Sequence, residues 1–129
     1  MKILFFGRGV IGTQYAWAFE NAGHTVEFYV REGRKEHYGS HVNLEILDAR
    51  RSKKDRLVKE KWPIVMQEEI KENHDYNLIF MSVNPEQVSS AVKYLAPRVG
   101  NATVLFFCNF WQDPQSAVQS IPLSQIVYG

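Results

Sequence analysis

The sequence predicts an α/β fold with a doubly wound, mostly parallel sheet, because apolar runs alternate with helical patterns along its 129 residues. The apolar runs have the length of buried strands, and the segments between them repeat apolar residues at helical spacing. A glycine-rich turn directly follows the first run. Together these features are typical of a Rossmann-like fold in a single domain, 1–129, that is large enough to form a hydrophobic core.

The first elements are expected between the N-terminus and residue 30. Ile3–Phe6 is predicted to be a buried strand, and Thr25–Val30 is predicted to be the second strand. A helix is predicted between them, from about Ile11 to Ala22, and Gly23 suits its C-cap because a left-handed conformation is needed there. Its inward face is expected to carry Ile11, Tyr15, Ala18, Phe19 and Ala22.

The second half of the chain repeats the strand and helix alternation. Leu78–Val83 is predicted to be a central strand, and Pro85 suits the first turn of the helix after it. That helix should stop near Pro97 and point Val88, Ala91, Val92 and Leu95 inward. The last expected elements are a strand at Ala102–Phe107, a short helix at Gln115–Ser120 and the start of a strand at Ile126–Tyr128.

Residues 42–66 depart from this alternation. Apolar and polar residues alternate over Val42–Ile46, which predicts a half-exposed strand, and a basic stretch runs from Arg50 to Lys61. We expect a β-rich insertion with the basic stretch in or beside a hairpin loop. Asp55 and Glu60 interrupt the cations and no aromatic stacking platform accompanies them, so a solvated face is favoured over a nucleic-acid site.

The glycine-rich turn, residues 7–12, has the spacing G-x-G-x-x-G. In a dinucleotide-binding loop Gly7 permits the tight turn, Gly9 allows close approach to the pyrophosphate, and Gly12 lets the next helix pack against the sheet. The N-terminus of that helix presents N–H groups and a positive dipole end to the anion. We therefore expect Gly7, Gly9 and Gly12, with the intervening Arg8, Val10 and Ile11, to bind a dinucleotide.

The end of the second predicted strand indicates which dinucleotide. An acidic residue there usually holds the ribose 2′-hydroxyl of NAD, but the chain has Arg31, followed by Arg34 and Lys35. A guanidinium suits a 2′-phosphate and cannot accept a hydrogen bond from a hydroxyl, which favours NADP(H). Two alternatives remain: Glu32 could bind the hydroxyl if the strand ended one residue later, or Arg31 could simply pair with a surface carboxylate.

Composition excludes several classes of protein. The net charge of +1 provides no general field to attract nucleic acid or a membrane, and no apolar run approaches the ~20 residues needed to span a bilayer. Cys108 is the only cysteine, so no internal disulfide can form, and it is expected to be a small core residue in a reducing compartment. No secretory signal precedes the first strand, so a cytoplasmic protein is expected. The four histidines lack metal-ligand spacing, and no metal is expected.

With these residues in place, the chain resembles the ketopantoate reductase (2-dehydropantoate 2-reductase) family over essentially its whole length. The resemblance rests on the first strand, the glycine loop, Arg31 and two further stretches. Residues 81–88, Met-Ser-Val-Asn-Pro-Glu-Gln-Val, are similar to the family's fourth-strand segment, and Phe107-Cys108-Asn109 is similar to its Gln-Asn-Gly at the end of strand five. The chain departs from the family at Asn84, where a lysine is usual, and at Phe110 and Trp111, where glycine is preferred.

The resemblance implies NADPH-dependent reduction of a 2-keto acid in a full-length enzyme. It assigns the pyrophosphate to the glycine loop and the 2′-phosphate to Arg31, with Val83 and Asn84 beside the cofactor and Asn109 near the nicotinamide and substrate. It also implies that the family's helical C-terminal domain, which carries the catalytic lysine, is absent from these residues. We therefore expect the chain alone to bind cofactor without turnover. The alternatives are a non-enzymatic dinucleotide sensor and a module that forms a homodimer through an open sheet edge.

Overall fold

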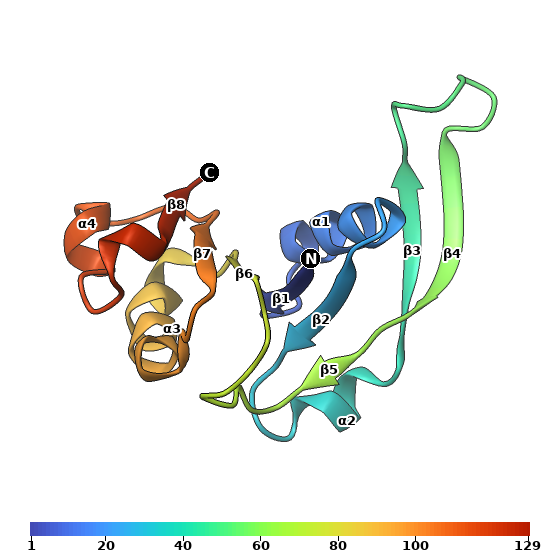
Figure 1. Ribbon diagram of the computed structural model, residues 1–129. Coiled ribbons are helices and arrows are strands. Elements are labelled where there is room, and N and C mark those ends of the chain that lie inside the picture. Colours follow the sequence, from blue (N-terminus) through green and yellow to red (C-terminus); the bar gives the residue numbers. More distant parts are fainter.

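A six-stranded sheet forms the centre of the molecule, and all of its strands are parallel (Figure 1). The computed structural model describes residues 1–129. The strand order is β5-β2-β1-β6-β7-β8, which confirms the predicted doubly wound α/β fold. The strands are β1 (Lys2–Phe6), β2 (Thr25–Tyr29), β5 (Met66–Gln67), β6 (Leu78–Met81), β7 (Thr103–Phe106) and β8 (Ile126–Tyr128).

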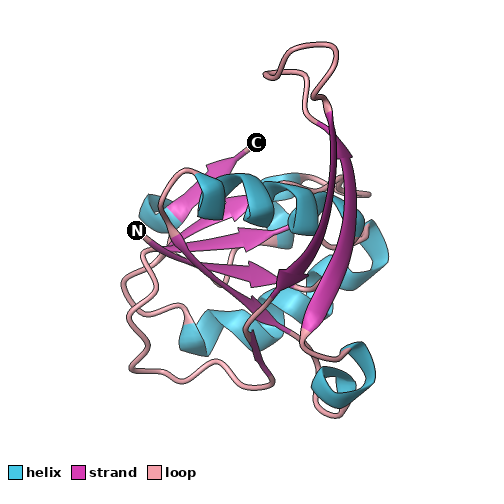
Figure 2. Cartoon of the chain, turned by 90° about the vertical axis from the view of Figure 1, so that its right-hand side faces the viewer, coloured by secondary structure: helices cyan, strands magenta, loops and turns pink.

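Helices lie on both faces of this sheet (Figure 2). On one face α1 (Val10–Asn21) packs beside a β-hairpin, and on the other α3 (Val88–Leu95) packs near α4 (Pro114–Ala117). None of the helices is long and apolar enough to cross a lipid bilayer. The remaining elements are α2 (Arg34–Tyr38) and the 3-10 turns η1 (Pro85–Gln87), η2 (Ala96–Arg98) and η3 (Leu123–Gln125).

The sheet separates two hydrophobic cores. Because successive side chains of a strand point to opposite faces, β1 contributes Ile3 and Phe5 to the core under α1 and Leu4 and Phe6 to the core under α3. Both faces of the strand are buried, as expected for a parallel sheet covered on two sides. The predicted inward residues of the second long helix, α3, are all buried: Val88, Ala91, Val92 and Leu95.

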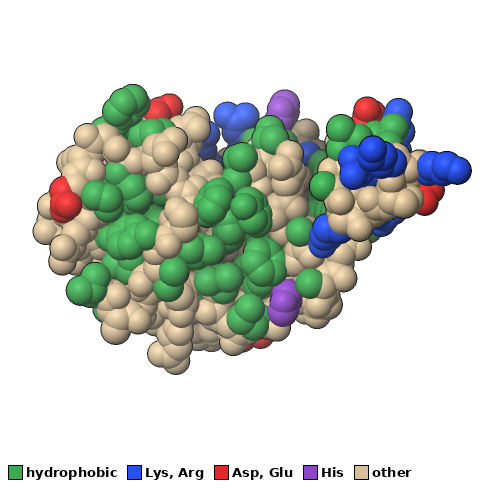
Figure 3. Space-filling model, turned by 90° about the horizontal axis from the view of Figure 1, so that it is seen from above, with side chains coloured by type: hydrophobic (Ala, Val, Ile, Leu, Met, Phe, Trp, Pro, Cys, Tyr) green, Lys and Arg blue, Asp and Glu red, His purple; other side chains and the backbone are tan.

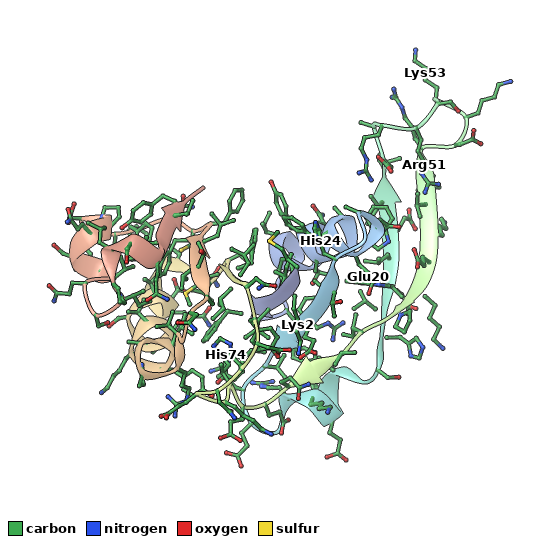
Figure 4. All side chains as sticks on the ribbon, viewed as in Figure 1. Lys2, Glu20, His24, Arg51, Lys53 and His74 are labelled. Carbon is green, nitrogen blue, oxygen red and sulfur yellow. The ribbon has the colours of Figure 1, made fainter.

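The predicted β-rich insertion is an antiparallel hairpin of β3 (His41–Leu47) and β4 (Leu57–Pro63). In the chain the hairpin comes between β2 and β5, where a doubly wound fold usually has a crossover helix. Its free end projects from the body of the molecule (Figure 1). The basic loop lies at this end, with Arg51 and Lys53 at the tip (Figure 4). Lysine and arginine side chains therefore gather on the hairpin in the view from above (Figure 3).

Two tryptophans and two glutamates fasten this hairpin to α1. The Trp17 indole N–H donates to the Glu60 carboxylate at 3.0 Å, and the Trp62 indole N–H donates to the Glu20 carboxylate. Both rings are almost fully buried, so Trp17 and Trp62 also pack in the interior. Glu20 lies on the side of α1 that faces the hairpin (Figure 4).

The predicted inward face of α1 is wrong in part: Ala18 and Phe19 pack half-buried against the core, but Ile11, Tyr15 and Ala22 are exposed. Ile11 and Tyr15 are 48% and 40% exposed, and the buried residues are Gly12, Thr13, Ala16 and Trp17. The reason is a close approach of α1 to the sheet through its small residues: a Cβ at Gly12 would lie 2.9 Å from the Ser82 hydroxyl oxygen. The helix is apolar on several sides, so its sequence pattern alone favoured the larger side chains.

Other differences concern short elements. The strand predicted to reach Val83 ends at Met81, because the chain turns there toward η1. Two elements had no predicted counterpart, namely α2 and the two-residue strand β5. The short helix predicted at 115–120 is α4, which begins and ends a little earlier. The remaining predicted elements shift by one residue or less at their ends, and Ile126–Tyr128 matches β8.

Candidate dinucleotide site

A cavity of about 450 Å³ opens at the carboxyl ends of β1, β2 and β6. The strand order reverses between β1 and β6, and ligands of doubly wound sheets bind at this switch point. The walls of the cavity are the glycine loop, the end of β2, α2, and the segment from the end of β6 into α3. The lining residues are Phe6, Gly7, Arg8, Gly9, Tyr29, Val30, Arg31, Arg34, Tyr38, Ser82, Val83, Asn84, Gln87, Ser90, Ala91 and Tyr94.

The glycine loop forms the floor between β1 and α1. Gly7 has φ +93°, a conformation that side chains rarely adopt, and its N–H donates to the Tyr29 carbonyl at 2.8 Å. Gly9 is the N-cap of α1, and no side chain caps this end of the helix. The first N–H groups of α1 therefore remain free to bind an anion. Gly12 lies under the loop, against Ser82.

Three arginines line the cavity and no carboxylate does. Arg8 comes from the glycine loop, and Arg31 and Arg34 follow β2, joined by a hydrogen bond from the Arg34 N–H to the Arg31 carbonyl at 3.0 Å. None of the three forms a salt bridge in the structure. The alternative in which Arg31 pairs with a surface carboxylate is therefore not the arrangement observed. Glu32 is exposed and is not a lining residue.

Aromatic rings form the wall beneath the arginines. The Tyr29 ring lies 4.6 Å from Phe6 and stacks on Tyr94 at 5.0 Å, measured between centroids. The Arg98 guanidinium lies over the Tyr94 ring, and its central carbon is 4.2 Å from the centroid of that ring. Burial, followed by the interaction with Tyr94, raises the pKa of Tyr29 to about 12. Tyr29 is thus a neutral, apolar surface for a ligand at any physiological pH.

The opposite wall is polar and comes from the start of the helix after β6. Pro85 begins η1, as expected of the first helical turn, and the Asn84 N–H donates to the Gln87 side chain across a long 3.4 Å. Gln87 and Ser90 are one helical turn apart and both line the cavity. Asn84 therefore lies at the cavity edge as part of a helix start.

Some of the predicted site residues lie outside this cavity. Val10 and Ile11 are exposed on the first turn of α1, beyond the lining. Asn109 is exposed after β7 and is not brought to the cavity. Cys108 is half-buried against the α3 core, as predicted, and burial raises its pKa to about 11. It lines a separate hollow of about 380 Å³ with Phe106, Phe110 and Tyr128.

Sequence reasoning missed the aromatic wall and the contribution of α2. Tyr29, Tyr38 and Tyr94 line the cavity but are not among the predicted site residues. The polar pair Gln87 and Ser90 could have been found, because it forms the exposed stripe of a helix that starts at the carboxyl edge of the sheet. No group of three or more His, Cys, Asp or Glu side chains is arranged to hold a metal ion.

A family model described as ketopantoate reductase PanE/ApbA matches residues 3–129. The chain belongs to this family. The match includes every lining residue of the cavity, so the cavity lies within the part of the chain that defines the family. No curated protein matches the chain.

Solved structures of several proteins share the fold of this chain. A PanE/ApbA family ketopantoate reductase from Ralstonia eutropha JMP134 superposes with TM-score 0.73 at 19% identity, covering 99% of this chain and 40% of that one. A 2-dehydropantoate 2-reductase from Geobacter metallireducens GS-15 superposes with TM-score 0.72 at 17% sequence identity. The match covers 99% of this chain and 40% of that one. A D-mandelate dehydrogenase bound to NADH and anilino(oxo)acetate superposes with TM-score 0.71 at 19% sequence identity. The match covers 100% of this chain and 40% of that one. This chain thus spans about 40% of the length of these proteins.

Proposed function

We propose that this chain is the NADP(H)-binding domain of a ketopantoate-reductase-like oxidoreductase. In the longer enzyme the cofactor transfers a hydride to a 2-keto acid, which becomes a 2-hydroxy acid. One observation carries the proposal: the cavity at the glycine loop is lined by arginines from the end of β2 and by no carboxylate. The chain's own part is to bind and orient the cofactor.

The electrostatics of the cavity favour a phosphorylated ribose. An NAD site needs an acceptor for the ribose 2′-hydroxyl, and that acceptor is usually an Asp or Glu at the end of the second strand. Here that place is taken by Arg31. Glu27 accepts hydrogen bonds from Tyr76 at 2.5 Å and from Gln67 at 3.3 Å, and Glu32 is not a lining residue. The related mandelate dehydrogenase structure contains NADH, so cofactor choice within the fold has to be decided by residues of this kind.

Family resemblance and position suggest how the remaining groups act. The pyrophosphate would meet the free N–H groups at the start of α1. Val83, Asn84 and, farther along the sheet, Asn109 would lie toward the nicotinamide and the keto acid. Asn84 provides an amide where the family usually has a cation, so it would bind a carboxylate less strongly than a lysine.

The proposal is tested by titrating the purified chain with NADPH and with NADH, following nicotinamide fluorescence. We expect NADPH to bind more tightly. Arg31→Ala should weaken NADPH binding by about 10- to 100-fold, since it removes a hydrogen bond between charged groups worth about 1.5–3 kcal/mol. NADH binding should change by less than about threefold in the same variant, because NADH lacks the 2′-phosphate.

Arg56→Ala is the matched control. Arg56 is exposed in the hairpin loop and forms no salt bridge, so its loss changes net charge equally without touching the cavity. Equal affinity for the two cofactors, or equal losses in the Arg31 and Arg56 variants, would refute NADP(H) recognition. Failure to bind either cofactor would refute the function itself.

A further inference from the structure

The proposed function leaves one cation of the cavity without a role. Arg8 occupies the first variable position of the glycine loop, where a small residue would suffice for the turn. It is half-buried, it lines the cavity, and it has no carboxylate partner. A guanidinium that shares a cavity with two others and with no carboxylate is unfavourable, so its position calls for an explanation.

Contact with α2 determines where the Arg8 guanidinium lies. Its central carbon is 4.6 Å from the centroid of the Tyr38 ring, in a cation–π arrangement. Tyr38 is the last residue of α2, and Arg34 is the first. Residues four apart on a helix share a face, so Tyr38 and Arg34 lie on the same side of α2, and both line the cavity.

The guanidinium of Arg8 is thereby held on the β2 and α2 side of the cavity. A pyrophosphate would bind at the first turn of α1, which begins at Val10 and does not include α2. Arg31 and Arg34 are on the α2 side, at the end of β2, where the adenosine ribose binds in doubly wound folds. Arg8 therefore faces the same region as the two arginines that follow β2.

We propose that Arg8, positioned by the ring of Tyr38, binds the ribose 2′-phosphate together with Arg31 and Arg34. The inference rests on the proposed NADP(H) function and adds a specificity-determining residue from the glycine loop. A phosphomonoester carries between one and two negative charges near neutral pH and presents three acceptor oxygens. Three guanidiniums from two chain segments can surround such a group, whereas a pyrophosphate diester at the helix start has no need of them.

The test uses two fragments of the cofactor that differ only in this phosphate, 2′,5′-ADP and 5′-AMP, with isothermal titration calorimetry of the whole chain. Arg8→Ala should weaken 2′,5′-ADP by about tenfold or more and 5′-AMP by less than about twofold. Arg8→Met, which keeps most of the side-chain length, should give the same result. Circular dichroism melts of each variant establish that the fold is retained.

Tyr38 separates positioning from contact. Tyr38→Leu removes the ring and should weaken 2′,5′-ADP by about two- to fivefold, whereas Tyr38→Phe keeps the ring and should stay within about twofold of the original. Equal weakening of both fragments in Arg8→Ala would overturn the inference, because Arg8 would then act on the shared 5′-phosphate or adenosine. If Arg8→Ala left the affinity for 2′,5′-ADP unchanged while Arg31→Ala clearly weakened it, the role of Arg8 would be overturned and the proposed function would stand. If neither fragment nor NADPH bound, both would be overturned.

Discussion

Removing the Trp62 indole should weaken the packing of the hairpin against α1 and lower the free energy of unfolding. The ring is 2% exposed, it packs edge-on against Phe28 at 6.0 Å between centroids, and it donates a hydrogen bond to Glu20. Truncating a buried tryptophan to alanine costs about 3–5 kcal/mol. That is a large share of the about 5–15 kcal/mol that stabilises a typical domain. Trp62→Phe removes the N–H donor and part of the ring, which should lower the free energy of unfolding by about 1–2 kcal/mol.

Urea unfolding followed by far-ultraviolet circular dichroism measures these losses without relying on tryptophan fluorescence. For a domain of this size each kcal/mol corresponds to about 3–5 °C in Tm, so Trp62→Phe should melt several degrees below the original. Trp111→Ala is the matched control, because Trp111 is 81% exposed. NADPH affinity should be unchanged in Trp62→Phe, since no residue of β3 or β4 lines the cavity.

Two results would refute this reasoning. If Trp62→Phe unfolded at the same urea concentration as the original chain, the indole would have no stabilising role. If Trp111→Ala were equally destabilised, the loss would follow from tryptophan content and not from the contact with α1. A change in the slope of the unfolding transition would instead indicate that the hairpin had already detached in the native state.

Two further predictions concern backbone conformation and alkaline pH. Gly7→Ala should lower the free energy of unfolding by about 1–2 kcal/mol through the positive φ alone, since no atom lies within 4 Å of the added Cβ. Gly7→Asn should recover part of this loss. Equal thermal melts for the original chain and both variants would contradict the claim that the backbone at this position is strained for a residue with a side chain. Stability should be constant to about pH 8.5 and fall as pH rises toward 12, because the folded state raises the pKa of Cys108 to about 11 and that of Tyr29 to about 12. Urea titrations at successive pH values check this, and undiminished stability at pH 11 would contradict it.

The sequence pattern was sufficient for those parts of the fold in which local signals and packing agree. The glycine spacing, the apolar run before it and Pro85 each have a direct local cause, so β1, the loop and the start of η1 were predictable. The packed face of α1 was not, because its closeness to the sheet depends on Ser82, about 70 residues later. Two-residue β5 has too little sequence to show a pattern.

The candidate site divides in the same way. Arg31 was predictable because its position at a strand end has a known chemical meaning. Tyr38 and its contact with Arg8 were not, since the contact joins a glycine loop to a helix of five residues that follows a different strand. Asn109 belongs to the neighbouring strand end, which the cavity does not reach.

The lack of buried residues in α2 has a thermodynamic consequence for ligand binding. Every residue from 31 to 40 is exposed, and the Lys35 N–H donates to the Glu68 carboxylate at 3.0 Å as one of the few bonds that tie this segment to the rest. A segment with so little apolar contact opens at a low free energy. Closing it around a phosphate would therefore trade conformational entropy for the enthalpy of charged hydrogen bonds. The glycine loop, by contrast, is fixed by the sheet, so the two ends of one dinucleotide would differ in the ordering entropy that binding costs.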